Sequence, residues 1–218
     1  MYAEKQITIA IASENYSERI AIKIRTLELL SVFDMLCLVI LIVIQTLAAM
    51  KMAVLNKLLE QRAYTDTHTG LPNKSACEEL LNNKETVGKH TACIMFDLNN
   101  LKIINDTKGH LMGDQLILNF ARLLRNVIPQ KDFVGRYGGD EFMAVIYNTS
   151  KTEIEDILKQ LSREKDRLNS SGNNMPIDYA CGWAISDADS ECTIQMLLDK
   201  ADYYMYENKQ AYKKSKKS

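Results

Sequence analysis

The stretch Arg136-Tyr137-Gly138-Gly139-Asp140-Glu141-Phe142 lies between two short apolar runs, residues 133–134 and residues 142–146. This pattern predicts a β-hairpin whose turn is Gly-Gly followed by two carboxylates. Paired glycines accept positive φ angles and leave no side chain between the backbone and an approaching ligand. Carboxylates at such a turn suit a hard cation bound through oxygen. Taken alone, Gly-Gly-Asp favours an ordinary surface hairpin with acidic residues for solubility, so the surrounding sequence has to decide.

Alternating elements surround this hairpin. Apolar periodicity and turn residues predict helices at residues 73–83, 113–127, 152–168 and 193–209, and strands at residues 91–96, 133–137, 142–147 and 177–185. The order is a helix, then β-α-β-β-α-β, then a helix. It predicts an α+β, ferredoxin-like fold, an antiparallel sheet backed by helices, as in nucleotide cyclases and polymerase palm domains. That fold hosts many chemistries and does not define an activity.

The composition is that of a globular chain. Charged residues make up 25% and apolar residues 46%, and the net charge of -1 gives no reason to expect nucleic acid as a partner. The five cysteines are odd in number, widely spaced and lack a C-x-x-C pair, so we expect neither a disulfide framework nor a zinc site. A reducing, cytoplasmic compartment fits the main domain.

Residues 32–50 form the most hydrophobic run, with only Asp34, Gln45 and Thr46 clearly polar. As a helix it would be about 28 Å long, close to the hydrocarbon thickness of a bilayer. Residues 36–44 are apolar on every face, which favours a single transmembrane helix over the alternatives of a buried core helix or a dimeric coiled coil. The preceding residues 1–31 show no secretory signal and indicate no function.

Residues 51–65 continue the helix. Ala48, Met52, Leu55, Leu59 and Arg62 alternate at spacings of four and three, the a/d rhythm of a short coiled coil. We expect a dimerising stalk here, and a plain amphipathic linker is the alternative.

Three motifs carry a family resemblance. The stretch 136–142 resembles the GGDEF signature of bacterial diguanylate cyclases, which condense two GTP into cyclic di-GMP. Residues 66–73 resemble the family's D-x-L-T-G-L-x-N pattern, with His68 in place of the usual Leu, and residues 97–114 resemble its D-x-D-x-F-K-x-x-N-D-x-x-G-H-x-x-G-D block. Residues 201–209 are similar to its A-D-x-A-L-Y-x-A-K ending. The resemblance covers about residues 66–213 and implies a GGDEF domain at residues 66–218.

Two carboxylates are candidates for metal binding. Asp97 ends a predicted strand and Asp140 lies at the hairpin turn, so they meet at one end of the sheet if the strands are neighbours. The resemblance implies two Mg²⁺ per active site, with Mn²⁺ as an alternative, held by Asp97, the carbonyl of Leu98 and Asp140. Asn99 replaces the second Asp of the family's D-x-D, which is not its main metal ligand, so we expect activity to survive.

The same resemblance implies how GTP is bound. The N–H groups of Asn100 and Leu101 would meet phosphate oxygens, and Lys102, Lys209 and Lys213 would neutralise phosphate charge. For Lys213, a solvated lysine that complements the helix dipole is the alternative.

The guanine base would be read by Asn105 and Asp114, because a carboxylate accepts hydrogen bonds from the N1 and exocyclic amino groups that guanine offers. His110 would line the same pocket, and a packed loop histidine is the alternative.

Catalysis would use Asp140 and the metal to deprotonate a ribose 3′-hydroxyl, with Glu141 assisting or supporting the turn. Two GTP then release two pyrophosphates. One subunit holds one GTP, so the resemblance implies a homodimer. A domain that uses GTP must face the cytoplasm, which predicts a single-pass protein of the cytoplasmic (inner) membrane, since the flanking basic residues alone do not decide orientation.

The family's product-inhibition motif, R-x-x-D, is altered. Asp132 matches, but Pro129 stands at the arginine position and the shifted Lys131 does not replace a bidentate guanidinium. We therefore expect weak or absent feedback by this route.

Two other functions compete. A non-catalytic GGDEF module could bind GTP or dimerise, although the intact Asp97, Lys102 and Asp140 argue against it. A cyclase could make another dinucleotide, although Asp114 favours GTP. No phosphodiesterase domain is expected, because the chain ends after the last predicted helix.

Overall fold

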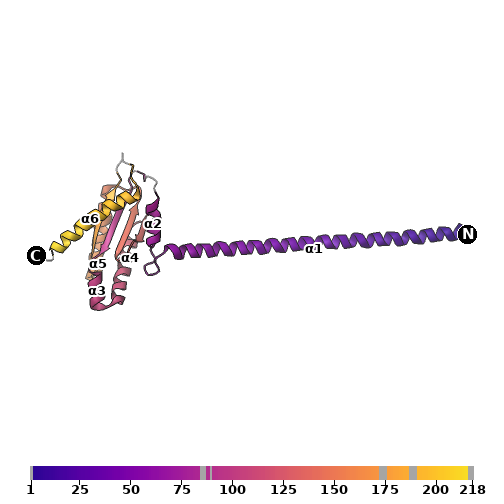
Figure 1. Cartoon of the computed structure of the whole chain (residues 1–218), viewed down its shortest axis with the longest axis horizontal. Coiled ribbons are helices and arrows are strands. Elements are labelled where there is room, and N and C mark those ends of the chain that lie inside the picture. The colour runs from indigo at the N-terminus through magenta and orange to yellow at the C-terminus, as the bar shows by residue number, and fades with distance from the viewer. Residues whose placement is uncertain (1, 84–86, 89, 172–175, 187–190, 216–218) are drawn as a thin grey trace. The chain divides into compact units, whose positions relative to one another are not determined.

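The computed structural model describes residues 2–83, 87–88, 90–171, 176–186 and 191–215, without the side chains of residues 2–13, 61, 212, 213 and 215. The chain divides into two compact units, Met1–Leu59 and Glu60–Ser218. Figure 1 shows the first as a single long helix and the second as a sheet with helices around it.

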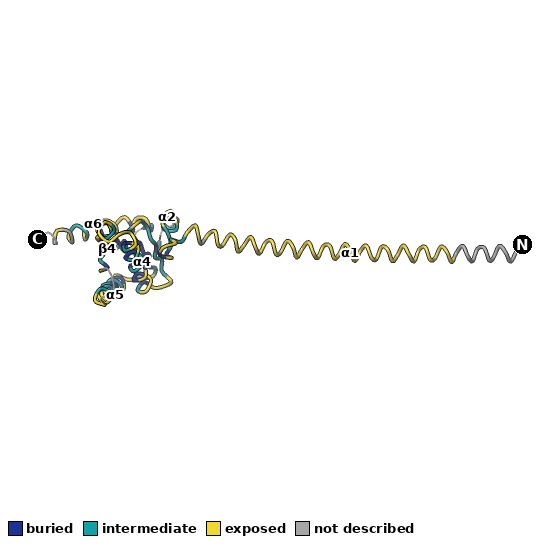
Figure 2. Tube along the Cα trace, turned by 90° about the horizontal axis from the view of Figure 1, so that it is seen from below, coloured by how far each residue is buried: buried dark blue, intermediate teal, exposed yellow. Residues whose placement is uncertain are grey.

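The first unit belongs to α1 (Tyr2–Tyr64), a continuous helix of 63 residues. Its described side chains are exposed up to Leu59, including the apolar ones (Figure 2). By length and composition alone, the part Glu14–Tyr64 could cross a membrane. The helix runs without a break through the three segments that the sequence distinguished, residues 1–31, 32–50 and 51–65. It ends at Tyr64, where the predicted loop begins.

The second unit is built on a four-stranded sheet, β1 (Ala92–Leu98), β2 (Phe133–Arg136), β3 (Glu141–Ile146) and β4 (Tyr179–Ile185). The strand order is β2-β3-β1-β4 and every pair is antiparallel. This is the order of a ferredoxin-like fold, and it confirms the predicted α+β class with its hairpin between β2 and β3.

Five helices accompany the sheet, α2 (Lys74–Asn82), α3 (Leu101–Lys108), α4 (His110–Val127), α5 (Lys151–Ser170) and α6 (Ile194–Ser215). Asn73 caps α2 as predicted, since its side chain accepts a hydrogen bond from the amide of Ala76. Helix α3 was not predicted, and α4 begins three residues earlier than expected. The apolar residues before Gly113 are interrupted by residues 105–110, which are polar or glycine, so they form no continuous helical repeat. Gly109, at φ 85°, separates the two helices.

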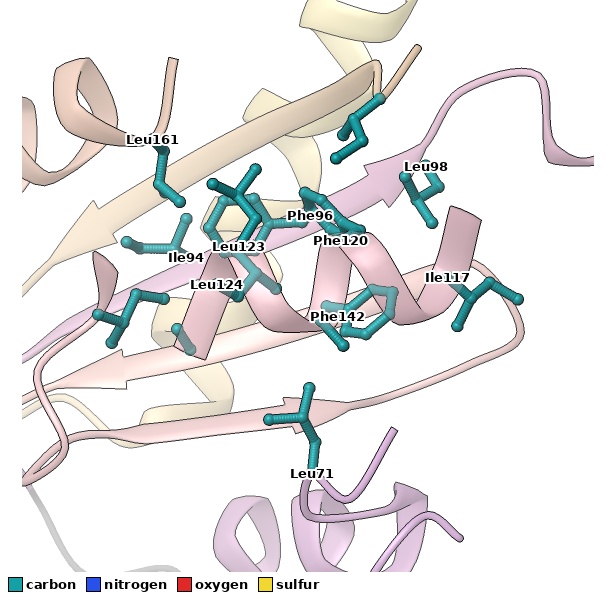
Figure 3. Close-up of a cluster of buried hydrophobic side chains, with 14 of the residues drawn as sticks. Leu71, Ile94, Phe96, Leu98, Ile117, Phe120, Leu123, Leu124, Phe142 and Leu161 are labelled. Atoms are coloured by element: carbon teal, nitrogen blue, oxygen red, sulfur yellow. The ribbon is translucent and has the colours of Figure 1, made fainter. Parts of the chain in front are cut away.

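Both faces of the sheet are covered, so all seven residues of the central strand β1 are buried. Ile94, Phe96 and Leu98 belong to a core that includes residues of α4 and α5 (Figure 3). Cys93 and Met95 point to the other face, into a core with residues of α2 and α6. This alternation follows from the two-residue period of a strand. Because β1 lies between these two cores, its C-terminal end, with Asp97, is buried.

Helix α6 lies unusually close to β4 at Gly182. A Cβ atom at this position would lie 2.1 Å from the backbone N of Met205 and 2.2 Å from the carbonyl O of Ala201. Only glycine permits such an approach, because the atoms in the way belong to backbone. The close packing places the later part of α6, with Asp202 and Lys209, near the end of the sheet that carries the candidate site.

Candidate active site

The C-terminal end of β1 meets the N-terminal end of β3. Asp97 is paired with Glu141 across the two strands, and the amide of Leu98 donates a hydrogen bond of 2.9 Å to the carbonyl of Asp140. The hairpin turn closes when the amides of Tyr137 and Gly138 donate to the carbonyl of Glu141, at 2.9 and 3.1 Å. Strands β1 and β3 are neighbours, so Asp97 in β1 and Asp140 in the turn before β3 lie at the same end of the sheet, as expected.

Asp97 is a buried carboxylate with one free oxygen. The residue is 5% exposed, and Lys209 Nζ lies 2.6 Å from Oδ2. Its Oδ1 atom is buried and has no hydrogen-bond partner among the described residues. An unpartnered, buried carboxylate oxygen is costly in free energy unless a ligand satisfies it.

The site is acidic beyond the predicted pair. Burial raises the pKa of the Glu141 carboxyl, and the charges of Asp140, Asp97 and Asp202 raise it further, whereas Lys209 lowers it. Asp202 was not predicted as a site residue. Asp202 belongs to the family motif on α6. Its position near β1 and β3 depends on how α6 packs on the sheet, and a sequence motif does not predict that packing.

The donor chemistry fits Mg²⁺. This ion takes one or two protein carboxylates and completes its shell with water and phosphate oxygens. Asp97 and Asp140 are such a pair, and the free Oδ1 of Asp97 supplies an available ligand atom. The described residues contain no group of three or more His, Cys, Asp or Glu residues that could hold a metal ion.

A helix start, whose first amides suit an anion, follows β1 directly. Asn100 adopts the left-handed conformation, at φ 65°, and Leu101 begins α3. The first amides of a helix have no partner within the helix and carry its positive dipole end, so they suit an anion. The structure places the amides of Asn100 and Leu101 at this helix start, where the resemblance expected phosphate contacts.

The two predicted guanine-reading residues lie on packed helices, Asn105 on α3 and Asp114 on α4. A Cβ atom at Gly113 would lie only 1.9 Å from Oδ1 of Asn105, so the amide of Asn105 lies over the glycine that directly precedes Asp114. Asp114 itself is exposed to solvent.

For the remaining predicted residues, the structure describes no bond to the rest of the site. Lys102 and His110 are exposed, on α3 and at the start of α4, and within the described residues no hydrogen bond or ion pair links them to another site residue. The side chain of Lys213 lies outside the described residues.

The altered inhibition motif lies beside a hollow of about 430 Å³, lined in part by Arg125, Pro129, Gln130, Asp132 and Phe133. Asp132 faces inward: its Oδ1 accepts a hydrogen bond of 3.1 Å from the amide of Tyr147. Pro129 offers its carbonyl to the amide of Asp132 and has no side-chain donor.

Fold and site together define a palm-like domain of the nucleotide-cyclase type. Comparison with known proteins then identifies the family. The family model described as "Diguanylate cyclase, GGDEF domain" matches residues 63–215, and the chain belongs to the GGDEF-domain family.

Individual relatives agree with this assignment. Signaling protein YkoW of Bacillus subtilis is 32% identical over 164 residues, covering 72% of this chain and 20% of YkoW. Diguanylate cyclase DgcP of Pseudomonas aeruginosa is 30% identical over 156 residues, covering 69% of this chain and 23% of DgcP. The crystal structure of the GGDEF domain of DgcB from Caulobacter crescentus, in complex with c-di-GMP, matches with a TM-score of 0.58 at 26% identity. It covers 68% of this chain and 91% of that domain. The chain thus spans less than a quarter of the length of the two curated relatives.

Proposed function

We propose that this protein is a diguanylate cyclase that condenses two GTP into cyclic di-GMP. The observation that carries the proposal is the free, buried Oδ1 of Asp97 beside the turn that presents Asp140. Membership of the GGDEF family supports the same conclusion. Lys209 pairs with Oδ2 of Asp97, and a bound cation would satisfy the remaining Oδ1 atom. A triphosphate would bring such a cation to the site.

GTP binding divides between two parts of the site. Asn105, Asp114 and His110 would hold the guanine base. Six other groups would hold the phosphates and their metal ions: the amides of Asn100 and Leu101, and the side chains of Lys102, Lys209, Lys213 and Asp97. The two Mg²⁺ ions, or Mn²⁺, held by Asp97, the carbonyl of Leu98 and Asp140 would supply Lewis-acid stabilisation of phosphate charge.

The reaction forms one bond and breaks one in each half. Asp140, supported by Glu141, would help to remove the proton of the 3′-hydroxyl of one GTP. The 3′-oxygen attacks the α-phosphorus of the second GTP, and the new O–P bond replaces the bond to the β-phosphate, so that pyrophosphate leaves. The second half repeats the step in the opposite direction and closes the ring. Lys102 and Lys209 offset the charge that collects on the phosphates.

This scheme needs two subunits, because each holds one GTP. We therefore propose a homodimer anchored in the cytoplasmic membrane by residues 32–50, with residues 51–65 as a coiled-coil stalk and residues 66–218 as the catalytic domain in the cytoplasm. Because Pro129 replaces an arginine, the enzyme is proposed to lack strong product inhibition through the R-x-x-D site.

The test incubates the full-length chain, in detergent or nanodiscs, with Mg²⁺ and either GTP, ATP or both, and identifies the products by mass spectrometry. Cyclic di-GMP from GTP alone is expected. Asp97→Asn and Asp140→Asn should each reduce product formation by at least about 100-fold. Asp156→Asn, an exposed carboxylate on α5 paired with Lys159, is the matched control and should keep full activity.

A catalytically inactive GGDEF module that binds GTP or dimerises is the second candidate. It would be favoured by a dimeric sample that binds GTP and releases no dinucleotide. A mixed dinucleotide from GTP plus ATP would instead favour a cyclase of different specificity.

A further inference from the structure

The loop that joins α1 to α2, residues 65–72, is folded tightly around one carboxylate. Oδ1 of Asp66 accepts hydrogen bonds from the amide and the hydroxyl of Thr69, at 2.8 and 2.7 Å. The amide of Asp66 donates to the carbonyl of Leu71, and the amide of Gly70 donates back to the carbonyl of Asp66. We call this segment the connecting loop. Its internal bonds make it a fixed body rather than a loose linker.

The connecting loop reaches the metal side of the site through Arg136. The guanidinium Nη1 of Arg136 lies 3.3 and 3.2 Å from the two carboxylate oxygens of Asp66. The same guanidinium donates from Nε to the carbonyl of Gly138, at 3.2 Å, and from Nη2 to the carbonyl of Gly139, at 2.8 Å. One planar group thus ties the connecting loop to both glycines of the turn that precedes Asp140.

The contact of Arg136 is important because the turn that it holds contains two consecutive glycines. Gly138 and Gly139 lack side chains that would restrict their backbone, so the turn has more conformational freedom than any other part of the hairpin. Arg136 and Asp66 are themselves only partly exposed, with 17% and 21% of their side-chain surface accessible. A shielded, charge-assisted contact is stronger than a solvated one.

The connecting loop reaches the guanine side of the site through His68. Its Nε2 atom lies 2.9 Å from the carbonyl O of Asp114, in the first turns of α4. A carbonyl oxygen only accepts, so Nε2 carries the proton in this contact. The GGDEF pattern usually has Leu at this position, which has no donor, so the contact distinguishes this chain from the pattern that it otherwise follows.

We propose that the connecting loop positions both halves of the site at once, with Asp66 and Arg136 fixing the turn before Asp140 and His68 fixing the backbone of Asp114. We call these positioning residues, because each one acts through its contact with another residue of the site. The proposal rests on the proposed function for the roles of Asp140 and Asp114. It predicts that the two arms are separable, since one arm contacts the turn and the other contacts α4.

The arm to the turn is tested with Arg136→Lys and Asp66→Asn. A lysine keeps the charge but cannot bond both glycine carbonyls and the carboxylate together. Each variant should lower kcat by about tenfold or more while KM for GTP changes less than about twofold. Hydrogen exchange of the amides of Tyr137 and Gly138, measured by mass spectrometry without substrate, should become faster in both variants.

The arm to the guanine reader is tested with His68→Leu and His68→Gln. Loss of one hydrogen bond should raise the Kd and KM for GTP by about fivefold, with kcat unchanged. Glutamine offers an amide donor in place of Nε2 and should restore most of the affinity. Exchange in a peptide covering residues 110–118 should be faster in the leucine variant and close to wild type in the glutamine variant.

Arg125→Ala is the matched control. Arg125 also donates to the connecting loop, from Nη2 to the carbonyl of Gly70 at 2.6 Å, but it touches neither the turn nor Asp114. It should lower the melting temperature as much as the test variants do and leave kcat, KM and the exchange at residues 137–138 unchanged.

The outcomes separate this proposal from the proposed function. If Arg125→Ala and the test variants change kcat, KM and exchange alike, the connecting loop only contributes stability and the positioning proposal is wrong. Unchanged exchange in both test regions also overturns it. If the wild-type protein makes no cyclic di-GMP but the variants still loosen their own region selectively, the proposed activity fails and the positioning role stands.

Discussion

In the structure, Lys209 is paired with a carboxylate, whereas the family resemblance implies that it contacts a phosphate. Its Nζ atom lies 2.6 Å from Oδ2 of Asp97, and the two side chains are 27% and 7% exposed. The pair balances a charge that would otherwise be buried alone. If Asp97 binds metal, the lysine and the metal compete for the same carboxylate. The triphosphate then gives the displaced lysine a new anionic partner.

Lys209→Gln should therefore change metal and nucleotide binding in opposite directions. Without nucleotide, Mn²⁺ should bind about tenfold more tightly than to the wild type, because no cation competes for Asp97. GTP should bind more weakly, because one phosphate contact is lost. Isothermal titration calorimetry measures both. Lys200→Gln removes an exposed lysine from the same helix and should change neither; Mn²⁺ binding that weakens in Lys209→Gln would contradict the competition.

Asp66 should make stability depend on pH. Burial alone raises the pKa of its carboxyl, but the hydrogen bonds from Thr69 and the charge of Arg136 outweigh burial and hold the pKa below the usual 3.8. In the folded protein the group thus stays ionised at a pH where the unfolded chain binds a proton. Its contribution to stability is complete above the unfolded pKa and is lost as pH falls through the folded one.

The measurement is denaturant unfolding of wild type and Asp66→Asn at several pH values. The wild type should be more stable by a constant amount above about pH 5, and the difference should shrink as the pH falls below 3.8. A difference that grows on acidification would show that Asp66 is not stabilised as the anion.

Sequence motifs were a good guide to which residues gather at this site and a poor guide to their contacts. Asp97 in β1 and Asp140 in the turn before β3 lie at the same end of the sheet as predicted, because positions at strand ends and turns follow from the strand pattern. Asp202 and the pairing of Lys209 with Asp97 were missed. Both depend on the rotation and depth of α6 against the sheet, which are set by packing at Gly182 rather than by local sequence.

At the scale of elements, Gly182 allows α6 to lie directly on β4. Gly182→Ala should destabilise the protein by about 2–3 kcal/mol, because the new methyl group meets the backbone of Ala201 and Met205 and α6 must move away. Activity should fall as well, since α6 carries Asp202 and Lys209. Thermal unfolding and cyclase assays check the two effects.

Gly88→Ala is the control, because a Cβ atom there meets nothing within 4 Å. It should leave stability and activity within experimental error. Equal effects of the two substitutions would mean that the cause is a general cost of replacing glycine rather than the contact with α6.

The elements with apolar periodicity were predictable and the polar ones were not. Strands β1 to β4 and helices α4 and α5 follow alternating or helical apolar patterns, although α4 begins earlier than expected. Helix α3 was overlooked because its eight residues, Leu101–Lys108, are half polar and none is buried. Its formation depends on the left-handed turn at Asn100 and on α4, with which it packs.

At the scale of the whole molecule, α1 presents apolar side chains that the chain itself does not cover. Leu55 and Leu59 are 46% and 55% exposed, although they stand at the a/d positions of the predicted stalk. A second copy of the same helix would bury them.

Leu55→Asp combined with Leu59→Asp should therefore convert a dimer of the full-length protein into a monomer, as measured by analytical ultracentrifugation in detergent. Cyclic di-GMP formation should fall in parallel, because two active sites must meet. Asn56→Asp adds one charge to the same helix outside the a/d positions and should leave the dimer intact. An unchanged mass for the double variant would rule out the stalk.

The two halves of the site, the Asp97 side and the side with Asn105 and Asp114, differ in how easily they open locally. Asp97 belongs to β1, which is buried along its whole length, whereas Asn105 and Asp114 lie on α3 and the exposed start of α4. Segments with few buried contacts open at lower free energy than the core does. Under mild heat or denaturant, α3 and the start of α4, which would contact the nucleotide under the proposed function, should therefore open before the strand that carries Asp97. Nucleotide binding would then be lost under stress while the carboxylate of Asp97 is still held in place.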